Sequence, residues 1–221
     1  MLSSAGKIVK VSCLGLWFGV HLAFPQHNLS FEFSTGVPYN VPLPLTIHQS
    51  GWSDISLTAH YSSEPFVVPI SWDWRIGYWS QDVGWEFEAI HHKIILDNRP
   101  GEVQWFAITH GLNVVVVNRA WIRSGFVFRA GAGISISHPE TIVRGKSLPE
   151  DRGLFGLGYY LSGPALHIAV GKRIFLTEEV LLSIEAKFFA SFSSVPIQDG
   201  TAEVFHAAFQ AGIGFGYAFA L

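Results

Sequence analysis

Residues 205–221 read FHAAFQAGIGFGYAFAL, and their side chains alternate between two kinds. The odd-numbered residues from Phe205 to Leu221 are all apolar, and most of them are aromatic. The residues between them are small or polar, and His206 is the only titratable one. Side chains of a β-strand point alternately to its two faces, so one face here is apolar and the other is crowded. A soluble sandwich would bury the aromatic face and expose a charged one, whereas this pattern is typical of a strand between lipid and a narrow interior.

The composition of the whole chain agrees with a lipid-facing surface. Hydrophobic residues make up 49% of the 221 residues, charged residues only 14%, and the mean hydropathy is +0.31. Outside the N-terminus, the sequence has no apolar run long enough for a helical membrane span. A closed barrel is the other structure that satisfies every backbone group within lipid. We therefore predict an all-β protein, an antiparallel up-and-down transmembrane β-barrel.

Charge and cysteine content exclude several classes of function. The net charge of −3 and the absence of a Lys/Arg run argue against a nucleic-acid partner. The single cysteine, Cys13, lies in a segment that we expect to be removed. The mature chain would then have no disulfide, cysteine–metal site or cysteine nucleophile, and we expect no cofactor.

The first 26 residues have the layout of a secretory signal. Lys7 and Lys10 precede an apolar run, 11–24, which is too short to cross a bilayer and is followed by Pro25. A buried core helix and a retained anchor are the alternatives. We expect residues 1–26 to be a signal peptide and residues 27–221 to form one barrel domain in the bacterial outer membrane.

Two further segments, 126–137 and 180–192, alternate with their charges on one side. A charge on the lipid face costs about 2–4 kcal/mol at mid-bilayer, so Arg129, Glu185 and Lys187 should point inward. More strands are expected at 54–63, 70–80, 84–96, 102–117 and 157–173, with a bulge at His91-His92.

The strand count follows from the turns. Tight periplasmic turns are expected at 81–83 and 175–178, and longer outer loops at 138–156 and 194–203. Because successive strands must run alternately between inner turns and outer loops, this assignment gives eight strands from residue 54 onward. Residues 28–50 then form either one more hairpin, making ten strands, or a periplasmic lead-in, and of the two we favour ten strands. Three prolines in this region favour a bend, because proline cannot donate to a sheet ladder.

The signal layout, the Gly-aromatic strands and the ending FGYAFAL (215–221) resemble small bacterial outer-membrane barrels, among them OmpA-like barrels and lipid A deacylases. One departure is the final residue, Leu221, where these barrels usually end on an aromatic. The resemblance implies a chain surrounded by outer-membrane lipid and lipopolysaccharide and inserted by the outer-membrane assembly machinery.

The best enzymatic candidate is His60-Tyr61-Ser62, which resembles the His-x-Ser signature of the deacylases. Spacing i, i+2 places a serine nucleophile and a histidine base on one strand face. A turn near Glu64–Pro69 would bring Asp73 on the adjacent strand to about the level of His60, as the orienting carboxylate. Alternation, however, turns His60 and Ser62 toward the interior, whereas a deacylase must meet acyl chains at the membrane face. The alternative is that all three residues belong to an interior hydrogen-bond network.

His91, His92 and His110, with Glu86 or Glu88 as the carboxylate, are the residue types that a metal site would need. Adjacent histidines on a strand point to opposite faces, so His91 and His92 cannot share an ion without a bulge. We therefore expect no metal. The tryptophans 52, 72, 74, 79, 85, 105 and 121 are interpreted as an aromatic girdle at the membrane interfaces.

The remaining charges suggest what fills the barrel. A narrow barrel has an interior just wide enough for side chains, and buried charges persist only when paired. We expect an interior salt-bridge network of Glu32, Arg75, Glu86, Glu88, Arg129, Glu185 and Lys187. The function we expect is non-enzymatic, with a filled polar lumen and outer loops that bind a ligand or partner. The alternatives are a lipid A or lipopolysaccharide acyl hydrolase and a narrow channel or small-ligand barrel.

Overall fold

The computed structural model describes residues 29–219, and the expected signal peptide lies outside these residues. The described residues form thirteen strands in one antiparallel sheet. Over this part of the chain, no helix has the length and apolar character needed to cross a membrane. The strands are β1 (Leu29–Asn40), β2 (Leu43–Gln49), β3 (Ile55–Ala59), β4 (Tyr61–Ser62), β5 (Trp72–Ser80), β6 (Val83–Leu96), β7 (Val103–Arg123), β8 (Phe126–Ser137), β9 (Glu140–Val143), β10 (Lys146–Ser147), β11 (Tyr160–Phe175), β12 (Val180–Ile197) and β13 (Gly200–Phe219).

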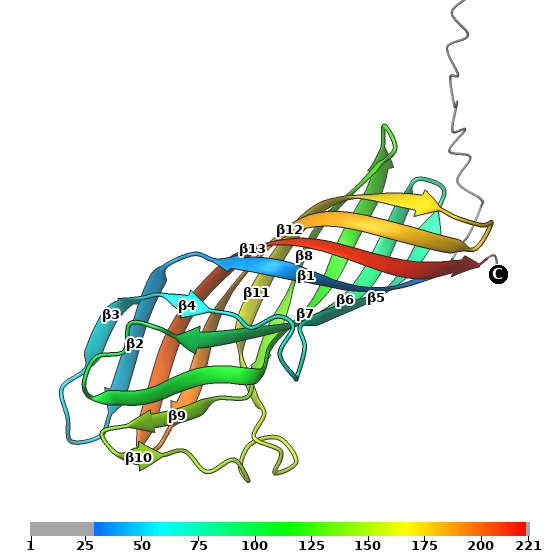
Figure 1. Cartoon of the computed structure of the whole chain (residues 1–221). Helices are drawn as coiled ribbons and strands as arrows, with labels where there is room; N and C mark the ends of the chain where they lie inside the picture. Colours follow the sequence, from blue (N-terminus) through cyan, green and yellow to red (C-terminus); the bar gives the residue numbers. More distant parts are fainter. Residues whose placement is uncertain (1–28, 220–221) are drawn as a thin grey trace, which may run out of the picture.

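Eight of these strands form a ring in the order β1-β5-β6-β7-β8-β11-β12-β13, and β13 pairs back onto β1 (Figure 1). The pairing can be followed residue by residue around this ring. A path that starts at Ser191 of β12 and steps from each residue to its partner on the next strand returns to β12 at Leu181, ten residues away. Such a stagger requires the strands to tilt against the barrel axis, as Figure 1 shows.

The ring has eight strands, within the predicted range of eight to ten but not the ten that were favoured, and its first strand is β1. The described part of the segment 28–50, residues 29–50, is neither an added hairpin nor a lead-in, because β1 itself crosses the barrel wall between β13 and β5. Pro42 lies between β1 and β2, and both strands follow β13 in turn. The expected strand at 54–63 becomes β3 and β4, which lie at the far end of the barrel (Figure 1).

The ring is closed unevenly at one place. β1 pairs with β13 over its whole length but with β5 only from Leu29 to Ser34. Beyond Ser34, the irregular segment 63–71 lies beside β1 in place of a strand. The Thr35 hydroxyl donates to the Ser71 carbonyl at 2.9 Å, and the Asn40 amide donates to the Ser63 hydroxyl at 2.9 Å.

The predicted turns at 81–83 and 175–178 are found, since Gln81-Asp82 joins β5 to β6 and 176–179 joins β11 to β12. The end of the barrel with these turns also holds Phe219, and by the usual rule it faces the periplasm. The expected loop 194–203 is wrong, because β12 and β13 continue through it to a two-residue turn at Gln198-Asp199.

The predicted alternation is confirmed in β8, β12 and β13. In β13, Phe209, Ile213 and Phe215 are more than half exposed, whereas Gln210 and Gly214 between them are buried. The exposed residues belong to an apolar band around the ring, and the buried ones face its interior. An apolar exterior of this kind is stable only against lipid.

Phe188→Arg should therefore destabilise the barrel by about 2–4 kcal/mol, because it places a charge on the lipid face at mid-strand. Phe188 packs on Phe209 across the outer surface, with ring centroids 4.9 Å apart. Ser194→Arg is the matched control, on the same face of β12 but beyond the ~9–11 residues that a spanning strand needs. Unfolding in detergent–lipid mixtures measures both, and equal tolerance of the two would contradict the assigned lipid face.

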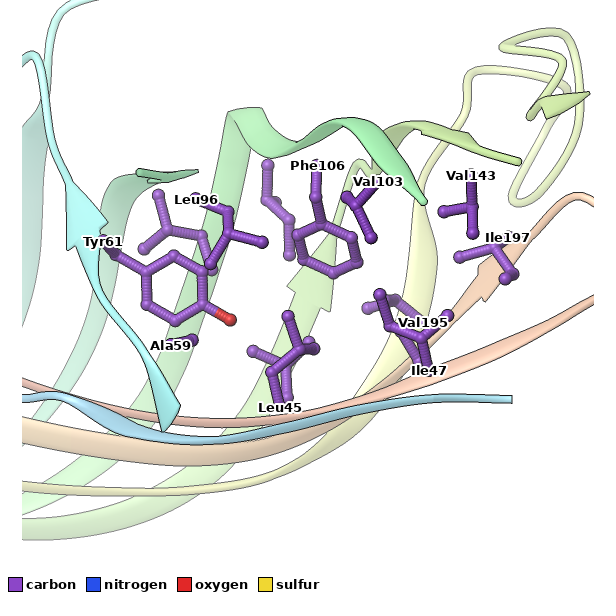
Figure 2. Close-up of a cluster of buried hydrophobic side chains, with 14 of the residues drawn as sticks. Leu45, Ile47, Ala59, Tyr61, Leu96, Val103, Phe106, Val143, Val195 and Ile197 are labelled. Carbon is purple, nitrogen blue, oxygen red and sulfur yellow. The ribbon is translucent and has the colours of Figure 1, made fainter. Parts of the chain in front are cut away.

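At the far end, the wall continues past the ring and encloses a second, apolar interior. Strands β2, β4 and β9 pair with the extended ends of β13, β6 and β7, and β3 pairs with β2. Their inward side chains form one buried cluster, in which Leu45, Phe106 and Tyr61 approach each other from different strands (Figure 2). We call this part of the molecule the far-end extension.

Candidate functional site

Nine charged side chains occupy the interior of the ring, and the seven expected ones are all among them. The register makes Glu32, Arg75 and Glu88 direct neighbours on β1, β5 and β6. The Arg75 guanidinium lies 2.8 Å from both Glu88 and Glu185. The Arg129 guanidinium lies 2.6 Å from Glu86 and also contacts Glu185. These groups are almost completely buried, so each charge depends on its partners.

Two members of this network lie outside the expected salt-bridge set, and one of them, Asp73, agrees with the alternative interpretation as a residue of an interior hydrogen-bond network. Arg173 donates to Glu86 at 2.8 Å and packs its guanidinium over the Trp79 ring at 4.4 Å. Asp73 accepts a hydrogen bond from Lys187 at 3.0 Å. Strand alternation in β11, where Lys172 faces outward and Arg173 inward, is the signal that would have identified Arg173.

The residues considered for catalysis lie apart from one another. The Ser62 hydroxyl donates to Asp97 at 2.7 Å, His60 is exposed, and Asp73 is deep in the ring beside Lys187. The physical reason is that the chain leaves the sheet after Ser62, so segment 63–71 separates β4 from β5 where a tight hairpin was expected. The structure therefore does not bring the expected base, nucleophile and orienting carboxylate together, and the expected arrangement is wrong.

Side chains also close the far-end extension at its tip. Gln49 is buried there and donates to the Gln198 carbonyl at 3.0 Å. Arg144 donates to the Ser53 carbonyl at 2.9 Å and stacks over the Trp52 ring at 5.0 Å. These contacts join the β2–β3, β9–β10 and β12–β13 turns into one structure.

A third group of polar residues lies on the outer side of the wall, where β7, β8 and β9 meet. The His110 ring lies 2.9 Å from a Glu140 oxygen and its centroid is 4.9 Å from that of His138. The Thr109 hydroxyl also donates to Glu140. Burial raises the pKa of Glu140, but hydrogen bonds from Thr109 and His110 outweigh burial and hold this pKa below the ordinary value. The carboxylate is therefore ionised at neutral pH.

An outward-facing hollow of about 470 Å³ lies beside this group. His91 stacks on Trp72 within it, with centroids 5.1 Å apart, and its Nδ1 lies 2.8 Å from the Asn113 oxygen. His92, by contrast, points into the barrel and lies 2.8 Å from Asn40. The two adjacent histidines thus face opposite sides, and the expected bulge follows them, because the register shifts between His92 and Ile94.

The tryptophans do not all belong to one girdle. Trp85 is exposed beside Arg119 near the end that carries the tight turns, as expected of an interfacial residue. Trp79 is 4% exposed and donates to Ser30 inside the ring, so its inclusion in the girdle is wrong. Trp52 is exposed at the opposite tip, beyond the ring.

No protein-family model matches this sequence, and no curated protein matches it. Solved structures match its shape at low identity. The outer membrane protein AlkL, solved in lipid bilayers, is 12% identical, with 99% of this chain and 98% of that chain covered and a TM-score of 0.48. OprG from Pseudomonas aeruginosa is 10% identical, with 89% and 98% covered and a TM-score of 0.46. Neisserial surface protein A is 10% identical, with 86% and 97% covered and a TM-score of 0.42.

The closed antiparallel ring, the apolar exterior and the charged interior define a transmembrane β-barrel. The chain therefore has the architecture of outer-membrane-type β-barrels.

Proposed function

We propose that this protein is a non-enzymatic, sealed barrel that anchors its far-end extension in the outer membrane and presents it to a ligand or partner outside the cell. The observation that carries this proposal is the interior of the ring. Asp73, Lys187, Glu185 and Arg129 reach across it from β5, β12 and β8. The space left beside Glu32 and Arg75 is about 10 Å³, roughly what one water molecule needs.

The far-end extension supports the same proposal. Above the charged network, the interior is filled by aliphatic and aromatic side chains that include Phe106 and Leu45, both 0% exposed. An ion or sugar would have to cross both layers. Breaking buried ion pairs is costly, so thermal motion opens such a path only rarely.

The extension is also built as a rigid surface for contact. Two arginines stack on tryptophans near its tip, Arg99 on Trp105 and Arg144 on Trp52. Aromatic and arginine side chains are enriched where proteins bind partners, since both give large contact areas. Side-chain hydrogen bonds between the turns at the tip hold this surface in place before a partner binds. Such preorganisation lowers the entropic cost of binding.

Planar-bilayer recordings and lipid A mass spectrometry together test this proposal. We expect no stepwise conductance from the reconstituted full-length protein and an unchanged lipid A profile when it is expressed. Steady single-channel conductance would overturn the sealed barrel in favour of a channel. Loss of an acyl chain from lipid A would overturn the non-enzymatic function, and Ser62→Ala would then show whether Ser62 is required.

A further inference from the structure

We infer that His110, His138 and Glu140 form a binding site for a divalent transition-metal ion such as Zn²⁺. One potential ligand atom from each residue lies within 4.8 Å of the other two. Two imidazoles and one carboxylate are an established ligand set for zinc, in which a fourth position is left for water or another ligand. Ligand atoms around tetrahedral zinc lie about 3.3 Å apart, given bonds of about 2.0–2.1 Å. His110 and Glu140 are already this close, and His138 offers a ring nitrogen within 4.8 Å of both.

The backbone brings these residues together at one corner of the barrel. His110 immediately precedes Gly111, whose φ of +118° turns β7 out of its regular path. His138 follows the last residue of β8, and its amide donates to the Gly111 carbonyl at 3.2 Å. Glu140 begins β9 and pairs there with Ala107 of β7. The three ligands therefore come from adjoining strands that are hydrogen-bonded to each other.

The His138 ring is buried, and one of its nitrogens has no hydrogen-bond partner among the described residues. The residue is 7% exposed, and this nitrogen, Nδ1, is inaccessible to solvent. Such an atom loses its hydration without compensation. Gly158 makes room for the ring, because a Cβ at this position would lie 2.3 Å from His138 Nε2. A metal ion between His138 and Glu140 would give the imidazole the partner it lacks.

Further contacts hold the other ligands in place. The Tyr159 hydroxyl donates to the His110 carbonyl at 3.2 Å, and its ring packs edge-on against His138 at 5.0 Å. The Thr109 hydroxyl donates to Glu140. Partners of this kind orient ligands and raise metal affinity in known sites.

The location keeps this site accessible. His110 lies thirteen residues along β7 from Arg123, and a membrane-spanning strand needs only ~9–11 residues. The cluster is therefore above the hydrocarbon layer on the outer side, where ions reach it from water. His110 and Tyr159 also line the 470 Å³ hollow, so a molecule bound there would lie beside the ion. Imidazole ligands favour Zn²⁺, Ni²⁺ and Cu²⁺ over Ca²⁺ and Mg²⁺, which prefer oxygen.

Zinc titration of the folded protein tests this inference. The full chain should be purified without a histidine tag, stripped with chelator and titrated calorimetrically with Zn²⁺, Ca²⁺ and Mg²⁺ in the same detergent. We expect one equivalent of Zn²⁺ to bind, with much weaker binding of the other two ions. His110→Ala should weaken Zn²⁺ binding at least tenfold, and so should Glu140→Gln, which keeps the shape of the side chain.

The controls separate a lost site from a lost fold. His60→Ala removes an exposed histidine outside the cluster and should leave the Zn²⁺ affinity unchanged. Heat-modifiable gel migration checks that each variant is folded, and His110 is exposed enough for its alanine variant to fold. Cu²⁺ bound to the wild type should show two nitrogen ligands by electron paramagnetic resonance, and one in His110→Ala. Absence of Zn²⁺ binding to the wild type, or equal affinity in folded His110→Ala, would overturn the site.

Discussion

Arg129→Met is expected to lower the free energy of unfolding by about 3–5 kcal/mol, as removal of one partner from a buried ion pair does. The Arg129 guanidinium lies 2.6 Å from Glu86 and also contacts Glu185. Arg129 is 3% exposed, so water cannot replace it as a partner for these carboxylates. The cost comes from the carboxylates left without a cation, more than from the lost attraction. Urea unfolding in detergent or lipid vesicles gives the value.

The double variant Arg129→Met/Glu185→Gln should recover much of that loss, because it removes one charge of each sign. Arg75 and Lys187, the other partners of Glu185, keep Glu88 as a counter-ion. A double-mutant cycle isolates this coupling. Lys146→Met is the exposed control, since the Lys146–Asp199 ion pair at the tip is open to solvent and screened by it. Small, additive effects of Arg129→Met and Glu185→Gln would mean that the lumen is wet, and would favour a channel.

The ring could be predicted from the sequence because lipid imposes a simple rule on it. Within the hydrocarbon, each outward residue must be apolar, so alternation in 180–192 and 205–221 identifies the strand and its lipid-facing side together. The same rule assigns Glu185 and Lys187 to the interior. Pairing partners could not be assigned in this way, because they depend on the stagger between strands. That stagger brings Lys187 of β12 to Asp73 of β5, 114 residues earlier in the chain.

The far-end extension could not be predicted, because no lipid constrains it. Residues 43–62 alternate like a membrane strand, but they form a hairpin above the membrane around an apolar interior of their own. The irregular segment 63–71 then displaces Asp73 from His60, which was expected to be its neighbour. The cluster of His110, His138 and Glu140 was missed for a related reason. It depends on a bend at Gly111, and a periodicity of two assumes that the strand continues straight.

Phe106→Ala is expected to destabilise the far-end extension by about 3–5 kcal/mol, through lost burial and the cavity left behind. Phe106 is 0% exposed and lies among side chains from β2, β7 and β9, including Leu45 and Val143 (Figure 2). The strands of this region are short, and β3 pairs with β2 alone. Their hydrogen bonds are therefore too few to hold the extension without its apolar interior.

The loss should remain local, because the ring has its own charged interior and a lipid exterior that this substitution does not touch. Amide exchange measured by mass spectrometry should show faster exchange in β2, β3 and β9, with β8 and β11 still protected. Phe66→Ala is the control, since Phe66 is 65% exposed and its removal leaves no buried cavity. Equal loss of protection in the ring would show that the barrel and its extension unfold as one unit. Unchanged exchange in β2 and β3 would show that the apolar interior does not hold the extension together, and the tip contacts of Gln49 and Arg144 would then have to do so alone.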